Sequence, residues 1–328
     1  MNARILTLII CLAFISELTH SLTLANDLAP TAIKVYPENM QLTTARDRQS
    51  VVVQAFYENG LTEDVTEKVA WKVSGESIVK QAKNVFFPLA DGKASLTVTY
   101  ANLNVTIPIE VKQATESKPI SFKSDVMAVF MKSNCNTGSC HGAARGKDGF
   151  RLSLFGFDPD GDYHRITREF AGRRINLAIP EDSLFIEKSI GSVPHTGGKR
   201  MEVGSEYYNT LLEWLQNGAL NDAGPVPTVT SVELYPKNGV LDGKDTKQRL
   251  TVRANYSDGS NRDVTSLAYF SSNNENSAKV SQDGLITAQA RGESFVMARF
   301  DTHTVGSHFI TLPKGFDFKW SNPPANNY

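Results

Sequence analysis

Apolar and polar residues alternate along two stretches of the chain, Ser50 to Tyr57 and Leu250 to Tyr256. A period of two is the pattern of a β-strand with one buried face. Each stretch runs into a turn, Asn59-Gly60 in the first case and Asp258-Gly259 in the second. Asn-Gly and Asp-Gly between alternating residues are strong hairpin signals, so both regions predict antiparallel β structure.

The two stretches belong to a repeat, because residues 31–66 and 230–265 match at a constant offset of 199 without a gap. The matches include Tyr36-Pro37 with Tyr235-Pro236, Asn39 with Asn238, and Asp64-Val65-Thr66 with Asp263-Val264-Thr265. A fixed offset over many positions indicates duplicated modules. Short strands with turn signals about every ten residues predict a sandwich of two sheets, in which Trp71 and Phe270 are the expected large core side chains.

Both copies resemble the group 2 bacterial immunoglobulin-like module. The resemblance rests on the Tyr-Pro entry, the Tyr-x-x-Gly hairpin, the Asp-Val-Thr strand and, in the second copy, residues 283–288. The first copy departs from the pattern there, with Val85-Phe86-Phe87-Pro88. The resemblance implies an extracytoplasmic spacer or binding role and no catalysis.

Between the copies, over residues 119–222, the apolar period changes from two to about 3.6, which predicts helices. One predicted helical face carries Phe122, Val126, Val129, Phe130 and Ser133. A second stripe consists of Tyr208, Leu211, Leu212 and Leu215, with Trp214 beside it and Gly218 placed to end the helix.

The N-terminus predicts export. Arg4 precedes an apolar run from Ile5 to Ile15, which has the length of a signal-peptide core, and Ala25 is the expected cleavage point. An uncleaved anchor is the alternative, and it is the one membrane contact that we expect. Ile10 stands where a lipoprotein signal has a small residue before Cys11, so lipidation is not expected. The formal net charge of -1 gives no case for nucleic acid.

After removal of a signal, the cysteines are Cys135 and Cys140, and His141 follows at once. Two thiols close in sequence can add to the vinyl groups of haem, and the next histidine can then bind the iron. Four residues separate these cysteines, whereas the usual motif is Cys-x-x-Cys-His. A disulfide is the main alternative. A zinc site is less favoured because a second cysteine pair is lacking. The prediction is one covalently bound haem c, with Cys135 and Cys140 as attachment sites and His141 as proximal ligand.

Over the whole middle segment the sequence also resembles the cytochrome-like domain of large exported planctomycete proteins. The matching features are Cys140-His141-Gly142, residues 147–154, Phe157-Asp158-Pro159, residues 172–175, residues 180–184, His195-x-Gly197-Gly198 and residues 214–219. In that group the domain lies beside immunoglobulin-like modules and ahead of further domains. The resemblance implies that this chain is a truncated form of a longer protein, with its last residues leading into the next domain.

The second iron ligand is expected in the loop before the last helix, where small cytochromes c place it. His195 is preferred and Met201 is the alternative, while His164 is less favoured because it follows a charged loop. Arg173 and Arg174 are candidates for contacts with haem propionates, since guanidinium suits carboxylate. A solvated charged turn is the equal alternative for these two arginines.

The predicted fold is multidomain, with two all-β immunoglobulin-like sandwiches flanking a mainly α cytochrome c-like domain. The predicted parts are a signal peptide (1–25), a sandwich (30–113), a haem domain (119–222), a second sandwich (228–313) and a linker or truncated tail (314–328).

The leading functional hypothesis is an exported electron-transfer or redox module, periplasmic or in the cell envelope, that is not an enzyme. Its redox partner is a protein that the sequence does not identify. The alternative is a structural or adhesion protein of the envelope with a Cys135-Cys140 disulfide and no haem. A haem peroxidase, which would need an open distal site, is a third hypothesis.

Overall fold

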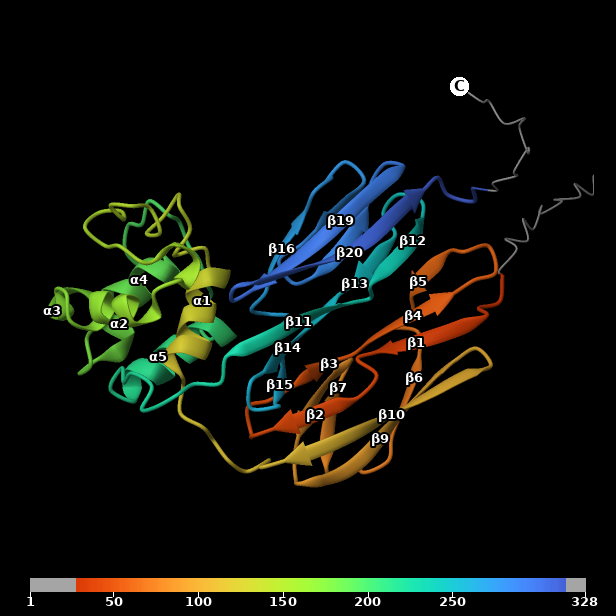
Figure 1. Ribbon diagram of the computed structural model, residues 1–328, viewed down its shortest axis with the longest axis horizontal. Helices are drawn as coiled ribbons and strands as arrows, with labels where there is room; N and C mark the ends of the chain where they lie inside the picture. The colour runs from red at the N-terminus through yellow and green to blue at the C-terminus, as the bar shows by residue number, and fades with distance from the viewer. Residues whose placement is uncertain (1–27, 317–328) are drawn as a thin grey trace, which may run out of the picture.

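The computed structural model describes residues 28–316 (Figure 1). The predicted signal peptide (1–25) and most of the predicted tail (314–328) lie outside the described residues.

The first β unit contains ten strands in three sheets. The strands are β1 (Ala32–Tyr36), β2 (Met40–Thr43), β3 (Gln49–Ser50), β4 (Val52–Phe56), β5 (Thr62–Asp64), β6 (Ala70–Val73), β7 (Val79–Ala82), β8 (Val85–Pro88), β9 (Gly92–Tyr100) and β10 (Leu103–Lys112). The sheet orders are β1-β4-β5, β2-β10-β9-β6 and β3-β8-β7. All neighbouring pairs are antiparallel except β2 with β10, which is parallel.

The second β unit repeats this topology. Its strands are β11 (Val229–Tyr235), β12 (Asn238–Asp242), β13 (Lys247–Arg249), β14 (Thr251–Tyr256), β15 (Asn261–Asp263), β16 (Tyr269–Ser272), β17 (Ala278–Val280), β18 (Leu285–Ala288), β19 (Gly292–Phe300) and β20 (His303–Leu312). The sheet orders β11-β14-β15, β12-β20-β19-β16 and β13-β18-β17 are those of the first unit shifted by ten strands. The sequence repeat therefore corresponds to a structural repeat.

The two units differ in how they fill their cores. Phe270 is fully buried in the second unit, as expected, but its counterpart Trp71 is only half-buried. Phe86 pairs with Gln49 in the first unit, and Ile286 pairs with the equivalent Gln248 in the second. Because the larger Phe86 occupies the position of Ile286, it fills the first core, and Trp71 packs edge-on against it at 6.0 Å.

Short helices occupy the segment between the two units. They are a π-helical turn (Phe122–Val126), α1 (Met127–Lys132), a 3₁₀ turn (Leu154–Gly156), α2 (Pro159–Thr167), α3 (Ala171–Arg174), a 3₁₀ turn (Pro180–Asp182), α4 (Leu184–Ile190) and α5 (Glu206–Gln216). Ser205 caps α5 by accepting a hydrogen bond from the Tyr208 backbone nitrogen. Gly218, at a φ of +86°, follows the end of α5. Its predicted role as a helix stop is consistent with this geometry.

The predicted fold class is wrong in its description of this segment. Residues 28–316 form six sheets and are mostly β, and none of their helices exceeds eleven residues. The periodicity of 3.6 is local, because residues with positive φ interrupt the chain between the helices. They include Asn134, Gly146, Asp148, Gly149, Phe155, Phe170 and Gly191. The segment is therefore a set of short helices and loops, and a large mainly α cytochrome domain is not indicated.

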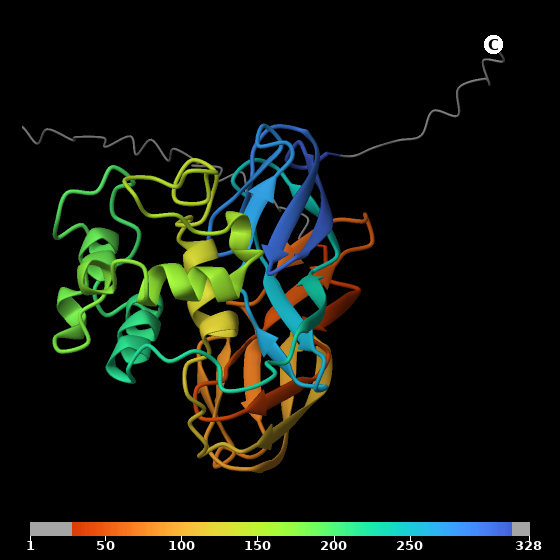
Figure 2. The same cartoon turned by 60° about the vertical axis from the view of Figure 1, so that its left-hand side comes forward.

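The helical segment and the second sandwich share one apolar core, while the first sandwich has its own. All six residues of α1 are buried, whereas the sequence predicted a single buried face. The rest of the helical segment covers one side of α1, and the second sandwich covers the other. Lys132 at its end donates from Nζ to the Ala268 carbonyl oxygen at 2.5 Å. Figure 2 shows the helices against the second sandwich, with the first sandwich below. Among residues 28–316, no helix is both long and apolar enough to span a bilayer.

Candidate functional site

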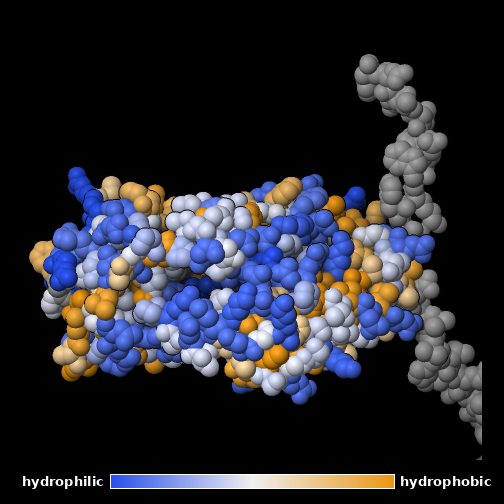
Figure 3. All heavy atoms as spheres, turned by 60° about the horizontal axis from the view of Figure 1, so that its bottom comes forward, coloured by the Kyte–Doolittle hydropathy of each residue, from blue (hydrophilic) through white to orange (hydrophobic). Residues whose placement is uncertain are grey.

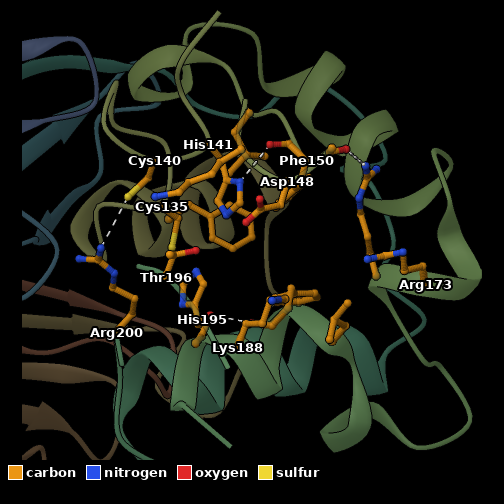
Figure 4. A pocket seen from close by; sticks show the side chains of 18 of the residues that line it. Cys135, Cys140, His141, Asp148, Phe150, Arg173, Lys188, His195, Thr196 and Arg200 are labelled. Atoms are coloured by element: carbon orange, nitrogen blue, oxygen red, sulfur yellow. Dashed lines mark hydrogen bonds between the residues drawn. The ribbon is translucent and has the colours of Figure 1, made fainter. Parts of the chain in front are cut away.

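A pocket of about 300 Å³ opens within the helical segment (Figure 4). Its apolar wall comes mainly from aromatic and aliphatic side chains: Phe130, Phe150, Leu152, Phe170, Leu184 and Phe185. Its cationic groups are Lys147, Arg173, Arg174, Lys188 and Arg200, and Asp148 is the carboxylate among its lining residues. Cys135, Cys140, His141 and His195 also line it.

A tight loop after α1 brings the two cysteines to the pocket. The Thr137 carbonyl oxygen accepts hydrogen bonds from the backbone nitrogens of Cys140 at 3.0 Å and Gly142 at 2.9 Å. The His141 nitrogen donates to the Cys135 carbonyl oxygen at 3.0 Å. A β-carbon on Gly142 would lie 2.1 Å from the Asn136 oxygen, so this loop path requires glycine at that position.

The two thiols have different surroundings. Burial raises the pKa of the Cys135 thiol to about 12. Cys140 accepts a hydrogen bond at its Sγ from Arg200 Nη2 at 3.5 Å (Figure 4). Both residues are free thiols in the structure. Desolvation therefore dominates at Cys135, where the charge of Arg200 opposes it only in part, whereas Cys140 contacts the guanidinium directly.

The two histidines also meet in the pocket. Each ring is held by a hydrogen bond from its Nδ1. His141 Nδ1 donates to the Phe150 carbonyl oxygen at 2.9 Å, and His195 Nδ1 donates to the Gly198 carbonyl oxygen at 2.9 Å. The ring planes are nearly parallel, at 6°, with centroids 6.4 Å apart. Desolvation lowers the pKa of His141 below its ordinary value, so this imidazole is neutral at pH 7.

The two adjacent arginines play different parts. Arg174 is buried and donates to the backbone oxygens of Glu169 at 2.6 Å and Gly149 at 2.9 Å. Its guanidinium lies 4.8 Å from the Phe150 ring centroid. Arg174 thus holds the pocket wall together, whereas Arg173 is exposed and can meet a ligand.

Sequence patterns found most of this constellation. The structure brings Cys135, Cys140, His141, His195 and both predicted arginines to one pocket. Met201, the alternative ligand, is buried in the core and does not line the pocket, and neither does His164. Residues that sequence reasoning missed are Lys147, Phe150, Phe185, Lys188 and Arg200. Lys147 and Phe150 lie in residues 147–154, which carried the resemblance, and Arg200 lies in the loop singled out for His195 and Met201. Phe185 and Lys188 carried no local signal.

The prediction of a haem c is wrong, together with the cytochrome c and electron-transfer assignments that depend on it. Across residues 28–316, no group of three or more His, Cys, Asp or Glu side chains is arranged to hold a metal ion. The segment also lacks the mainly α architecture on which the assignment depended. The Cys140 sulfur is engaged by Arg200 instead.

Comparison with known proteins identifies part of the chain. Residues 228–301 match the family described as bacterial Ig-like domain (group 2). No curated protein matches the chain. Nothing in these comparisons supports the resemblance to planctomycete proteins.

Several solved structures share a distant likeness. Domains 5–6 of the S-layer protein SbsC are 10% identical, with 87% of this chain and 99% of that chain covered and a TM-score of 0.33. Domains 1–6 of surface layer protein SbsC are 10% identical, with 88% and 29% covered and a TM-score of 0.24. Extracellular domains 3–5 of Drosophila OTK are 7% identical, with 87% and 63% covered and a TM-score of 0.17. The chain spans less than a third of the SbsC domain 1–6 structure.

The family match covers the second sandwich and agrees with the resemblance expected there from residues 283–288 and the Asp-Val-Thr strand. Group 2 Ig-like domains are consistent with an extracellular or cell-envelope protein. Residues 228–301 are thus a group 2 bacterial Ig-like domain.

Proposed function

We propose that this protein is a structural or adhesion component of the bacterial cell envelope. In this proposal the two sandwiches form one stiff body that displays the helical segment. The observation that carries it is the contact between the two sandwiches, which uses equivalent residues of the repeat on both sides.

Two aspartates make the same contact in opposite directions. Asp263 Oδ2 accepts a hydrogen bond from the Ser50 backbone nitrogen at 2.6 Å. Asp64 Oδ2 accepts one from the Arg249 backbone nitrogen at 2.7 Å. The offset of 199 relates Asp64 to Asp263 and Ser50 to Arg249. The second contact is therefore the first one with the two modules exchanged.

Further pairs obey the same exchange. Gln54 Nε2 donates to the Asn238 carbonyl oxygen at 2.9 Å, and Arg253 Nη1 donates to Asn39 Oδ1 at 3.0 Å. Gln54 is equivalent to Arg253, and Asn39 to Asn238. Reciprocal contacts of this kind define a two-fold, closed interface.

One pair lies where such a two-fold axis must pass. Tyr36 and Tyr235 are equivalent residues, and their rings stack on each other with centroids 5.2 Å apart and an interplanar angle of 16°. In a two-fold arrangement, a residue can touch its own equivalent in the other module only at the axis. The modules are therefore fixed side by side instead of following one another as beads on a flexible string (Figure 1).

The helical segment is attached to both sandwiches. Arg46 of the first sandwich pairs with Glu213 of α5 at 3.0 Å. Arg262 of the second sandwich pairs with Asp125 at 2.6 Å. On the face shown in Figure 3, hydrophilic residues predominate and apolar ones are interspersed. A stiff, hydrated body suits a spacer or structural component.

The cysteines have a structural role in this proposal. In an oxidising compartment Cys135 and Cys140 form a disulfide. Closing a loop of six residues stabilises the fold by about 2 kcal/mol on the chain-entropy account. We propose no catalysis and no nucleic-acid partner, and further domains of a longer chain remain the expected neighbours.

Fractionation of the native bacterium tests the proposal. Protein recovered with the envelope, and digested by protease added outside the cytoplasmic membrane, supports it. Recovery in the cytosol, with protection from the same protease, overturns it. Small-angle scattering of the purified chain tests the stiffness separately, since a hinge between the sandwiches would give an extended, variable particle.

A further inference from the structure

The pocket thiols are chemically unequal, and we infer that they form a dithiol–disulfide site that exchanges with small anionic disulfides outside the cytoplasm. Cys140 is the attacking sulfur and Cys135 the resolving one. This inference rests on the exported setting of the proposed function.

Cys140 has the surroundings of an attacking thiol. Its sulfur lines the open pocket and accepts the hydrogen bond from Arg200 Nη2. A guanidinium in contact with the sulfur can donate to the negative charge that the sulfur carries as it attacks a disulfide. Arg200 is itself positioned by the last turn of α4, because its backbone nitrogen donates to the Ser189 oxygen at 2.7 Å.

Cys135 has the surroundings of a resolving thiol. Its S–H points to the Ser133 carbonyl oxygen at 3.9 Å, a weak hydrogen bond, and the group is desolvated. Although Cys135 lines the same pocket and is half-buried, its raised pKa keeps it protonated while Cys140 reacts. The hydrogen bond from the His141 nitrogen to the Cys135 carbonyl oxygen keeps the backbones of the two cysteines close, as the second step requires.

The exchange balances without any other reactant. The Cys140 thiolate attacks R–S–S–R′, the S–S bond breaks, and a Cys140–S–S–R mixed disulfide and R′–S⁻ result. Cys135 then loses its proton and attacks the Cys140 sulfur as the thiolate; the bond from Cys140 to R–S breaks, and the leaving R–S⁻ takes up a proton to give R–SH. The two protein thiols are oxidised to the Cys135-Cys140 disulfide, and the external disulfide is reduced to two thiols.

The pocket indicates which disulfides suit the site. Five cationic side chains line it, with Asp148 as the carboxylate among the lining residues. Arg173 is exposed at its edge, and Lys188 donates from Nζ to the Pro194 carbonyl oxygen at 3.0 Å. Such a lining favours a compact disulfide that carries carboxylates over a neutral or cationic one. Glutathione disulfide is a probe of this class.

The test uses the full chain, reduced and then mixed with glutathione disulfide, followed by intact-mass spectrometry under acid quench. Cys135→Ser is expected to accumulate one glutathione adduct, on Cys140. Cys140→Ser is expected to react at least roughly tenfold more slowly, because the raised pKa of its remaining thiol, Cys135, keeps that group protonated. The unsubstituted chain is expected to pass through the adduct to the internal disulfide.

Arg200→Gln in the Cys135→Ser background isolates the guanidinium contact. We expect adduct formation to slow by roughly tenfold, while Arg200→Lys retains part of the rate. Lys188→Gln is the matched control, because it removes the same charge from the same pocket without touching the sulfur. Equal slowing in both variants overturns the role of Arg200.

Equal rates for Cys135 and Cys140 overturn the inference, and so does an absence of adduct in folded Cys135→Ser when the same chain reacts after denaturation. The envelope assignment survives either result, because fractionation tests it independently. A circular dichroism spectrum of each variant shows whether it has folded.

Discussion

Replacing Asp263 with alanine is the sharpest test of the interface between the sandwiches. Asp263 is 5% exposed, and its carboxylate accepts four hydrogen bonds. They come from the Ser50 nitrogen at 2.6 Å and Oγ at 2.5 Å, and from the Thr265 nitrogen at 2.9 Å and Oγ1 at 2.5 Å. Two bonds thus cross the interface, and two stay within the second sandwich.

The cost follows from the groups left behind. Asp263→Ala leaves two partly buried backbone N–H groups without these acceptors, at about 1–3 kcal/mol each where water cannot reach them, and two hydroxyls that can turn to other partners. We expect the free energy of unfolding to fall by about 3–5 kcal/mol in total. Asp64→Ala removes the equivalent bonds from Arg249 and Thr66, and we expect a similar loss.

The assay is urea unfolding at pH 7, followed by circular dichroism, with amide exchange at Ser50 and Arg249. Asp258→Ala is the control, because Asp258 is exposed and bonds only within its hairpin, to Ser260. We expect the control to cost less than about 1 kcal/mol.

The double variant Asp64→Ala/Asp263→Ala shows whether the two carboxylates stabilise a shared interface or only their own local turns. If the carboxylates hold the sandwiches together, the first substitution already opens the interface, and the double variant costs less than the sum of the singles. Strict additivity, or single losses below about 0.5 kcal/mol, refutes the reciprocal interface as a source of stability.

Three further predictions concern local features. Oxidation of Cys135 and Cys140 should raise the free energy of unfolding by about 2 kcal/mol, which calorimetry with and without reductant measures; no shift contradicts it. Desolvation raises the pKa of Asp47 to about 6, so its protonated form favours the fold. This contribution to the free energy of unfolding is complete below the unfolded pKa near 3.9 and is lost as pH rises through about 6. In Asp47→Asn, the free energy of unfolding measured against pH should lack this loss. A pH dependence identical to that of the unsubstituted chain argues against the prediction. Gly142→Ala should cost about 2 kcal/mol or more, because its β-carbon would strike the Asn136 oxygen, whereas Gly172→Ala, which meets nothing within 4 Å, should be nearly neutral; equal melting temperatures would refute this.

The sequence predicted local elements better than their assembly. The hairpins at Asn59-Gly60 and Asp258-Gly259 and the final helix around Leu211 depend on neighbours within a few residues, and a pattern along the chain records these. The prediction that Trp71 fills the first core was wrong because Phe86, which fills it, lies in another strand. The all-round burial of α1 was missed because the covering surface comes from residues more than a hundred positions later.

The pocket shows the same division. Cys135, Cys140 and His141 are neighbours in sequence, so they were found together, and the loop logic added His195. The surroundings of these residues could not be predicted from the sequence, since Arg200, which contacts Cys140, lies sixty positions away along the chain. The motif alone favoured haem attachment, whereas the contact with Arg200 and the short helices around the pocket favour a different use of the same sulfurs.

The repeat specifies the pairing of the two modules as well as their fold. An offset of 199 states that two modules are alike, but it does not state how they meet. The Asp-Val-Thr motif was interpreted as a strand signature. In both copies its aspartate is the last residue of a strand, β5 or β15, and the valine and threonine follow the strand end. Each aspartate also reaches the other module, at Arg249 from Asp64 and at Ser50 from Asp263. The aspartate of each copy therefore accepts hydrogen bonds both from its own turn and from a strand of the other module. One short motif can in this way specify both a fold and the pairing of two folds.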